Sequence, residues 1–377
     1  MKTRRAFLLS AVLTSAIFAV EVQAAPVRFG NQVEYMLTYG SLYESNIYHS
    51  YLDTQAVGAQ ANVIEGKLDW VMQPSRRFAQ TLGAYADLSL YTNYSNRNRT
   101  SFGIGYEPTL KYSRRGTFGL DIDVSRRNKD VLSDAGELLA RTLQKWQFDI
   151  KATNRLTFGK FRTEQTLMYD KSNYEDSYDS TGVRLPSYDY RSFGGEVDGR
   201  YRFHQNLRAR LRLSLEGRDY DERRTYTVAF GSFRGRPYEI RSFTERVTEF
   251  TLEIQPFRSV GLKGLVQYTK RTDNFENFYG FRQWEYKAEL ALTPIRKNEL
   301  KMSLEFRNKH YPNYWTSNIG RLNRVGIDYA TFEIEDTYQI SEAFALTGYL
   351  KNYNKVSNDP NFDYRDLTAG IGISIRR

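Results

Sequence analysis

The dominant feature of the sequence is a period of two in its hydrophobic and polar positions. Between Phe193 and Phe203 every second residue is apolar or glycine, and the residues between them include Glu196, Asp198, Arg200 and Arg202. After a short turn at His204-Gln205-Asn206, leucine or alanine again occupies every second position as far as Leu215. Successive side chains of a β-strand point to opposite faces, so the pattern predicts two antiparallel strands, each with one apolar and one charged face.

The same alternation recurs along the chain, at residues 102–112, 118–124, 284–292, 300–306 and 367–375. Strands of soluble domains average about 5–6 residues, whereas several of these runs reach ten or more. Strands of that length are typical of segments that cross a membrane at a tilt. Aromatic residues often occupy the first or last apolar position, where the interfacial girdles of such strands lie.

The connections between the predicted strands alternate in length. Short ones are expected near Gln73–Arg77, Ser113–Gly116, Thr153–Leu156, His204–Asn206, Pro256–Val260, Ile295–Glu299 and Ile340–Phe344. Longer ones are expected near Ser45–Gln55, Tyr94–Arg99, Asn128–Arg141, Lys171–Asp189, Asp219–Arg241, Asp273–Gly280, Asn308–Asn323 and Val356–Asp363. Seven short and eight long connections predict about sixteen strands, within a range of 14–18, with both termini on the short-turn, periplasmic side. Loss of phase after Phe158 and around Tyr329 predicts bulges there.

These features predict an all-β fold, a transmembrane up-and-down antiparallel β-barrel with short periplasmic turns and longer extracellular loops. Every backbone N–H and C=O is paired around a closed barrel, so its apolar face can meet lipid. A soluble β-sandwich or propeller is the alternative fold. It requires neither strands this long nor alternating connection lengths, and the sequence shows no repeat of blade length.

The N-terminus predicts an export signal. A basic start, Met1-Lys2-Thr3-Arg4-Arg5, precedes an apolar run from Ala6 to Val20 and the small-residue segment Val22-Gln23-Ala24. This order is typical of a cleaved secretory signal peptide, so we expect a signal at residues 1–24 and a barrel at 25–377. An uncleaved anchor is the alternative. Cleavage removes three basic residues and one acidic residue from a chain of net charge +10, which leaves +8.

The charged faces of the strands are expected to line a lumen in which acids and bases are roughly balanced. The predicted lining residues are Glu196, Asp198, Arg200, Arg202, Arg208, Arg210 and Arg212. The basic surplus falls mainly in turns and loops, for example at Arg114, Arg115, Arg296 and Lys297. Because these bases are scattered rather than gathered on one face, nucleic acid is not an expected partner.

Two short segments carry a resemblance to a family. The chain runs Val33-Glu34-Tyr35 and then Tyr43-Glu44-Ser45-Asn46-Ile47-Tyr48, and later Ser357-Asn358-Asp359-Pro360 to Asp363-Tyr364-Arg365. The first resembles the opening strand, and the second the closing hairpin, of the outer-membrane β-barrel porin families of Gram-negative bacteria. The chain departs from the terminal aromatic residue of such barrels, since it ends Ser374-Ile375-Arg376-Arg377. The resemblance implies an outer-membrane barrel and no particular substrate.

Catalytic and metal chemistry find little support. The chain has no cysteine, which excludes a disulfide scaffold, a thiolate metal site and a cysteine nucleophile. Two of its three histidines, His49 and His310, fall in expected long connections, and neither sits in a serine-elbow pattern. The acidic segment from Tyr174 to Asp179 lacks the spacing of a defined calcium loop. We therefore expect no catalytic residues, no metal and no cofactor, and do not expect an enzyme.

Aromatic clusters leave two readings open. One holds Phe275, Phe278, Tyr279, Phe281 and Trp284, and the other holds Tyr311, Tyr314 and Trp315. They could stack on sugar rings, but the favoured interpretation is a girdle that anchors the barrel in lipid.

Barrel size decides between a packed and an open interior. Eight-stranded barrels are filled by side chains, whereas about sixteen strands leave an aqueous channel. The connection Asp219–Arg241 is glycine-rich and basic, which makes Arg234 and Arg236 candidates for a constriction loop.

The sequence thus predicts a porin-like passive channel of the cell outer membrane for small hydrophilic, including anionic, solutes. Its expected partners are outer-membrane lipid and lipopolysaccharide, the solutes, and the barrel assembly machinery. The alternative is a structural or export barrel associated with surface polysaccharide or protein secretion.

Overall fold

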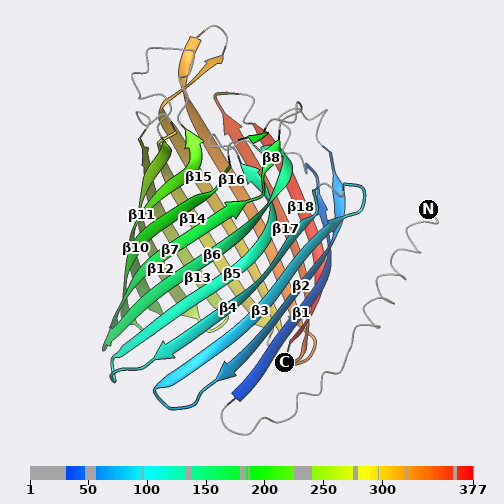
Figure 1. Cartoon of the computed structure of the whole chain (residues 1–377). Coiled ribbons are helices and arrows are strands. Elements are labelled where there is room, and N and C mark those ends of the chain that lie inside the picture. Colours follow the sequence, from blue (N-terminus) through cyan, green and yellow to red (C-terminus); the bar gives the residue numbers. More distant parts are fainter. Residues whose placement is uncertain are drawn as a thin grey trace, which may run out of the picture.

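The protein forms one closed, tilted β-barrel (Figure 1). The computed structural model describes residues 31–46, 57–94, 97–132, 138–178, 184–185, 187–224, 240–274, 279–295, 297–318, 321–359 and 363–376. The expected signal peptide therefore lies outside the described residues. Among the described residues, no helix is long and apolar enough to cross a membrane.

Sixteen long strands form the wall, and two short ones form a separate hairpin in the connection between β7 and β10. The wall strands are β1 (Asn31–Glu44), β2 (Ala59–Met72), β3 (Phe78–Tyr91), β4 (Arg99–Leu110), β5 (Gly116–Leu132), β6 (Leu138–Phe158), β7 (Phe161–Tyr174), β10 (Tyr190–His204), β11 (Leu207–Arg224), β12 (Ile240–Phe257), β13 (Val260–Asp273), β14 (Phe281–Ile295), β15 (Asn298–Asn318), β16 (Arg321–Gln339), β17 (Phe344–Ser357) and β18 (Tyr364–Arg376). The small hairpin pairs β8 (Ser177–Tyr178) with β9 (Arg184–Leu185). The predicted strand number and all-antiparallel class are confirmed.

The barrel closes where the first strand meets the last. β1 pairs antiparallel with β18 from Met36 opposite Arg376 to Glu44 opposite Thr368. The two backbones lie close together at this seam. A β-carbon added at Gly40 would stand only 2.7 Å from the carbonyl oxygen of Ile371, so a larger residue would not fit there without a shift. Closure pairs the edges of the sheet, which would otherwise expose a row of unsatisfied N–H and C=O groups.

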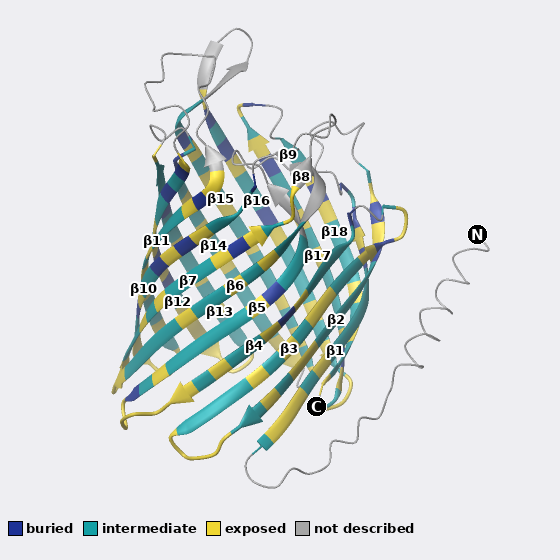
Figure 2. Ribbon diagram, in the orientation of Figure 1, coloured by how far each residue is buried: buried dark blue, intermediate teal, exposed yellow. Residues whose placement is uncertain are grey.

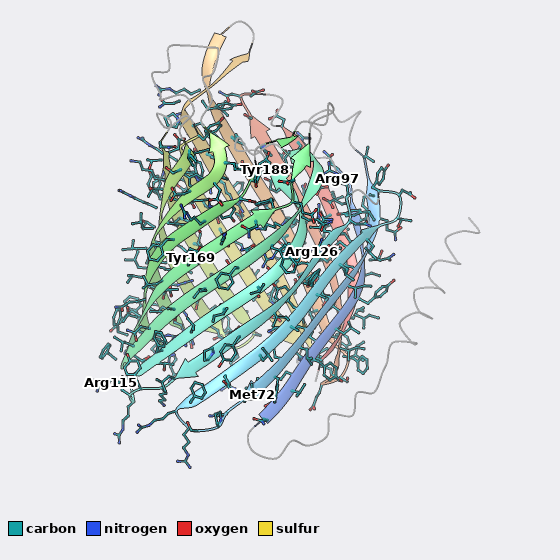
Figure 3. All side chains as sticks on the ribbon, in the orientation of Figure 1. Met72, Arg97, Arg115, Arg126, Tyr169 and Tyr188 are labelled. Carbon is teal, nitrogen blue, oxygen red and sulfur yellow. The ribbon has the colours of Figure 1, made fainter. Side chains whose placement is uncertain are left out.

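The two faces of the wall differ as the alternation predicts. Large apolar side chains are exposed on the outer face, among them Phe193, Leu213 and Ile371. In a soluble protein so many exposed apolar residues would be an aggregation hazard, whereas on a barrel they form the band that meets lipid. Figure 2 shows buried residues gathered toward the upper end of the barrel, near the long connections. The lower rim, where Figure 3 labels Arg115 and Met72, carries the short turns.

One predicted short turn is wrong. The segment Thr153–Leu156 lies inside β6, which continues to Phe158, and the chain reverses at Gly159-Lys160 instead. Gly159 adopts a φ of 59°, the left-handed conformation that a tight turn requires and glycine tolerates best. Asn154 is a strand residue whose side chain hydrogen-bonds to Tyr112 at 2.8 Å and to Gln165 at 3.4 Å.

Several predicted long connections are shorter than expected, among them Asp219–Arg241, which β11 enters as far as Arg224. The strands enter the segment Asn128–Arg141, since β5 ends at Leu132 and β6 begins at Leu138. They also enter Asn308–Asn323, because β15 runs to Asn318 and β16 begins at Arg321. The β15–β16 register shifts between His310 and Trp315, whereas pairing is continuous around Tyr329 and after Phe158. Neither predicted bulge is therefore present: the loss of phase after Phe158 marks the chain reversal at Gly159-Lys160, and the strand irregularity nearest to Tyr329 lies at His310–Trp315 on the neighbouring strand.

Opposite faces of one strand should respond differently to a new charge. Leu213→Arg places a charge on the outer face and should destabilise the barrel by roughly 2–4 kcal/mol if position 213 lies near the bilayer midplane. Ser214→Arg on the same strand places it on the inner face, opposite Glu196, and should cost clearly less. Urea titrations of both variants in lipid vesicles measure the difference. An equal or larger loss for Ser214→Arg would show that the strand faces are inverted.

Candidate functional site

The inner face of β10 and β11 brings together the residues singled out in the sequence. Glu196, Asp198, Arg200 and Arg202 occupy alternate positions of β10, and Arg208, Arg210 and Arg212 alternate positions of β11. In the β10–β11 register, Arg200 is directly opposite Arg210, and Arg202 is directly opposite Arg208. Like charges in directly opposed positions repel, so the wall needs carboxylates between them.

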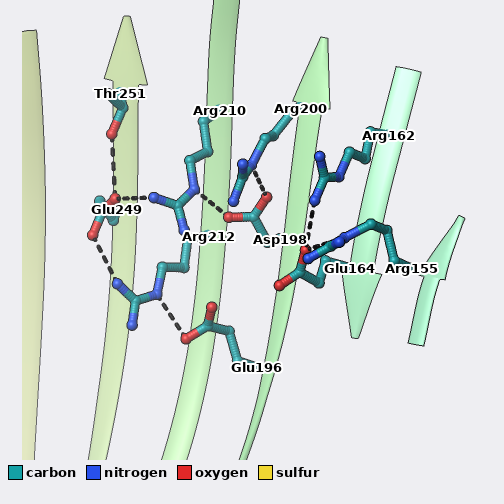
Figure 4. Close-up of polar contacts among 10 residues, drawn as sticks. All are labelled: Arg155, Arg162, Glu164, Glu196, Asp198, Arg200, Arg210, Arg212, Glu249 and Thr251. Carbon is teal, nitrogen blue, oxygen red and sulfur yellow. Dashed lines mark hydrogen bonds and ion pairs between the residues drawn. The ribbon is translucent and has the colours of Figure 1, made fainter. Parts of the chain in front are cut away.

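Asp198 separates two of these arginines. Its side chain is almost fully buried and accepts hydrogen bonds from Arg200 Nε at 2.8 Å and from Arg210 Nε (Figure 4). One carboxylate thus joins β10 to β11 through two charge-assisted bonds. Bonds of this kind are roughly twice as strong as neutral ones.

Glu249 continues the network onto β12. It is 5% exposed and lies 3.6 Å from Arg210 Nη1 and 3.3 Å from Arg212 Nη1, and it also accepts a hydrogen bond from Thr251. Arg212 donates in addition to Glu196 at 2.7 Å. Glu249 was not predicted from the sequence as a site residue, because its partners depend on the register between strands. The alternation of its segment does predict that its side chain lies on the inner face.

A separate group of ion pairs lies on the adjacent strands β6 and β7. Glu164 on β7 accepts hydrogen bonds from Arg155 on β6 at 2.9 Å and from Arg162 two residues away at 3.2 Å. We call the following six inner-face arginines of β7, β10 and β11 the arginine arc: Arg162, Arg200, Arg202, Arg208, Arg210 and Arg212. Figure 4 shows four of these, linked by dashed lines to the acids between them.

Arg202 and Arg208 are the exceptions in the arginine arc. Both are exposed near the short turn that joins β10 to β11. Among the described residues neither has an ion pair, although Glu253 is directly opposite Arg208 on β12. Their positive charge therefore remains open to the lumen at its short-turn end.

A second part of the lumen is acidic. We call the following inner-face carboxylates of β2–β5 the acidic arc: Glu65, Asp69, Asp87, Glu107, Asp121 and Asp123. Glu65 is directly opposite Asp87 across β2 and β3. Lys67 pairs with Asp69 at 2.6 Å, and Lys151 lies 3.9 Å from Asp121. The lining is thus divided into neighbouring acidic and basic sectors, a detail finer than the overall balance that the sequence predicts.

Toward the long connections, aromatic rings join the ion pairs on the inner face, and cations lie over these rings as well as beside carboxylates. The guanidinium of Arg218 lies 4.2 Å from the centre of the Tyr190 ring and 5.1 Å from that of Phe243. Arg271 lies 4.3 Å from Phe243 and 4.7 Å from Phe281, and Lys309 Nζ lies 4.0 Å from Phe281. This cation–π belt links β10 to β15, and each contact is worth about 0.5–2 kcal/mol. It stiffens the wall beneath the long connections.

The cation–π belt corrects the interpretation of two aromatic residues. Phe281 is 6% and Tyr311 1% exposed, and both pack on the inner face with Val325 and Ile327. They are therefore not part of a lipid-facing girdle, whereas Trp284 and Tyr286 are exposed on the outer face as that interpretation requires. The period of two already separates Phe281 from Trp284, since three positions apart on a strand means opposite faces.

Other candidate residues take no part in this site or lie outside the described residues. Arg234, Arg236 and His49 belong to the latter group, so a constriction loop stays a prediction. His204 lies in the turn region of β10, and His310 lies on β15 rather than in a loop. Glu175, in the acidic segment, pairs with Arg126 at 3.2 Å.

No protein-family model matches the sequence, and a comparison with curated proteins gives no match. Among solved structures, the chain is similar to a loop-deletion mutant of OmpT, an outer membrane protein of Vibrio cholerae, with a TM-score of 0.51 and 9% identity over 92% of this chain and 100% of that one. It is also similar to CdiB from Acinetobacter baumannii, with a TM-score of 0.52 and 9% identity over 92% of this chain and 60% of that one.

Such low identities show the fold alone. The chain is a sixteen-stranded barrel with the architecture of outer-membrane β-barrel proteins. Its particular activity has to be argued from its own lining.

The role of Asp198 can be tested by removing its charge. Asp198→Asn leaves Arg200 and Arg210 directly opposed, and should destabilise the barrel by about 1–3 kcal/mol, a range that allows for the partial exposure of both arginines. The matched control is Glu299→Gln, which breaks an exposed inner-face pair with Lys301 at 3.4 Å and should cost less than about 0.5 kcal/mol. Urea midpoints in vesicles give both values. Equal losses would mean that the buried carboxylate has no special role.

Proposed function

We propose that the protein is a passive channel of the outer membrane for small hydrophilic solutes. The observation that carries the proposal is the combination of sixteen closed strands with a charged inner face. A sheet of that size encloses more space than its own side chains fill. Ion pairs held between neighbouring strands leave the middle of such a lumen to water and solute.

Anion preference is the finer part of the proposal and rests on the arginine arc. Arg202 and Arg208 supply positive charge at the short-turn end, while Arg200, Arg210 and Arg212 are largely neutralised by their acids. The acidic arc opposes this field elsewhere in the lumen. We therefore propose a weak preference for small anions, which should fade as salt shortens the Debye length.

Reconstitution of the refolded protein in a planar bilayer tests both parts. The wild type should give discrete conductance steps. The double variant Arg202→Gln/Arg208→Gln should keep those steps and shift the zero-current potential in a salt gradient toward cation selectivity. The control Lys263→Gln/Glu289→Gln removes an inner-face ion pair of 2.9 Å without changing the net charge, and should leave the potential unchanged.

The outcomes separate the two parts. Absence of any conductance from correctly folded protein would rule out the channel. Normal conductance with an unshifted potential in the arginine variant would leave the channel standing and contradict the anion preference.

A further inference from the structure

A second group of basic residues lies on the outside of the barrel. Arg246, Lys270, Arg282 and His310 occupy four adjacent strands, β12 to β15, which Figure 1 shows side by side. The strand register makes them a continuous row, with Arg246 directly opposite Lys270, Lys270 opposite Arg282, and Arg282 opposite His310. We call this row the basic strip.

The alternation of each strand places the basic strip on the outer face. Arg282 is two residues from Trp284, and Lys270 two residues from Tyr268, so each shares a face with its neighbour. Tyr268 and Trp284 are directly opposite each other, with ring centres 4.8 Å apart. Aromatic residues of this kind mark the membrane interface. The basic strip follows them on the side of the long connections.

The basic strip has no internal counter-charge. Among the described residues, none of its four members forms an ion pair or a side-chain hydrogen bond. The neighbouring outward acid, Asp328 on β16, accepts a hydrogen bond from Asn308 at 2.6 Å. Like charges directly opposed on adjacent strands repel. In the arginine arc, carboxylates between the arginines offset this repulsion. The basic strip has no such carboxylates, so an anionic ligand from outside the chain could neutralise it.

We propose that the basic strip binds the phosphate groups of lipopolysaccharide in the outer leaflet. Its position fits this partner, because acyl chains would lie along the apolar residues and aromatic girdle, and the phosphates would lie just beyond them. Arginine and lysine bind phosphate through short charge-assisted hydrogen bonds, and a row of them on rigid strands can engage the phosphates at both ends of one lipid A headgroup. The proposal rests on the proposed outer-membrane location, but not on channel activity.

The experiment compares lipid binding by folded protein in detergent. Native mass spectrometry with diphosphorylated lipid A and, separately, with phosphatidylglycerol measures the affinity of each lipid. The strip variant Arg246→Gln/Lys270→Gln/Arg282→Gln should bind lipid A about tenfold more weakly than the wild type, because three charge-assisted contacts are weakened. The control Arg76→Gln/Arg77→Gln/Arg114→Gln removes three exposed bases from the short-turn rim and should bind as the wild type does.

Two further readouts keep the proposal falsifiable. Without lipid A, the strip variant should be no less stable to urea than the wild type, since it loses repulsion and no ion pair. If the triple variant does not fold, Lys270→Gln alone takes its place, because Lys270 is directly opposite an arginine on each neighbouring strand. The single-channel conductance of whichever variant is used should equal that of the wild type. A loss of lipid A binding can then be distinguished from a loss of channel activity.

The proposal would be overturned by equal lipid A affinity in the strip variant and the wild type. It would also be overturned if the rim control lost as much affinity, since binding would then follow net charge alone. Equal wild-type affinity for phosphatidylglycerol would contradict lipopolysaccharide as the partner.

Discussion

Closure of the backbone hydrogen-bond ladder is the constraint on which the rest of this structure depends. In lipid, an unpaired peptide group has no water to bind, so a sheet can be stable there only if its first and last strands meet. The seam between β1 and β18 meets this condition, and Gly40 allows the close approach of the two backbones. In a closed barrel, each wall side chain points either outward to the lipid or inward to the lumen. The period of two in the sequence follows from that division.

On the inner face, charged side chains of neighbouring strands are neutralised by ion pairs between the strands. Direct opposition of Arg200 and Arg210 would be unfavourable alone, and Asp198 between them turns the repulsion into two bonds that cross the strands. Toward the long connections the cation–π belt also joins neighbouring strands, with aromatic rings beside the carboxylates. Among the described residues, Arg202 and Arg208 inside and the basic strip outside have no ion-pair partner, and the proposals for solutes and for lipid therefore rest on these residues.

Much of this architecture could be predicted from the sequence, because strand faces and connection lengths are local properties. The alternation through Phe193, Val197 and Leu213 gave the correct outward residues. The turn was misplaced at Thr153–Leu156, where the polar Asn154 interrupts the apolar outer face of β6 and bonds to Tyr112 across the strands. The ion pairs of Glu249 could not be predicted, because they depend on the register between strands, which alternation alone does not specify. Phe281 was misassigned although its position relative to Trp284 already indicated the inner face.

Disulfide trapping at the seam tests closure and register together. Thr38 and Ser374 are directly opposite on the inner face of β1 and β18, within the separation that a disulfide can bridge. In this cysteine-free chain, mild oxidation of folded Thr38→Cys/Ser374→Cys should give an intramolecular disulfide. Thr153→Cys/Thr166→Cys, across β6 and β7, is the positive control, since the two hydroxyls are 3.2 Å apart. Thr38→Cys/Ile375→Cys, one residue out of register, should give none. A cross-link in the control pair but not at the seam would show that the ring is not closed as described.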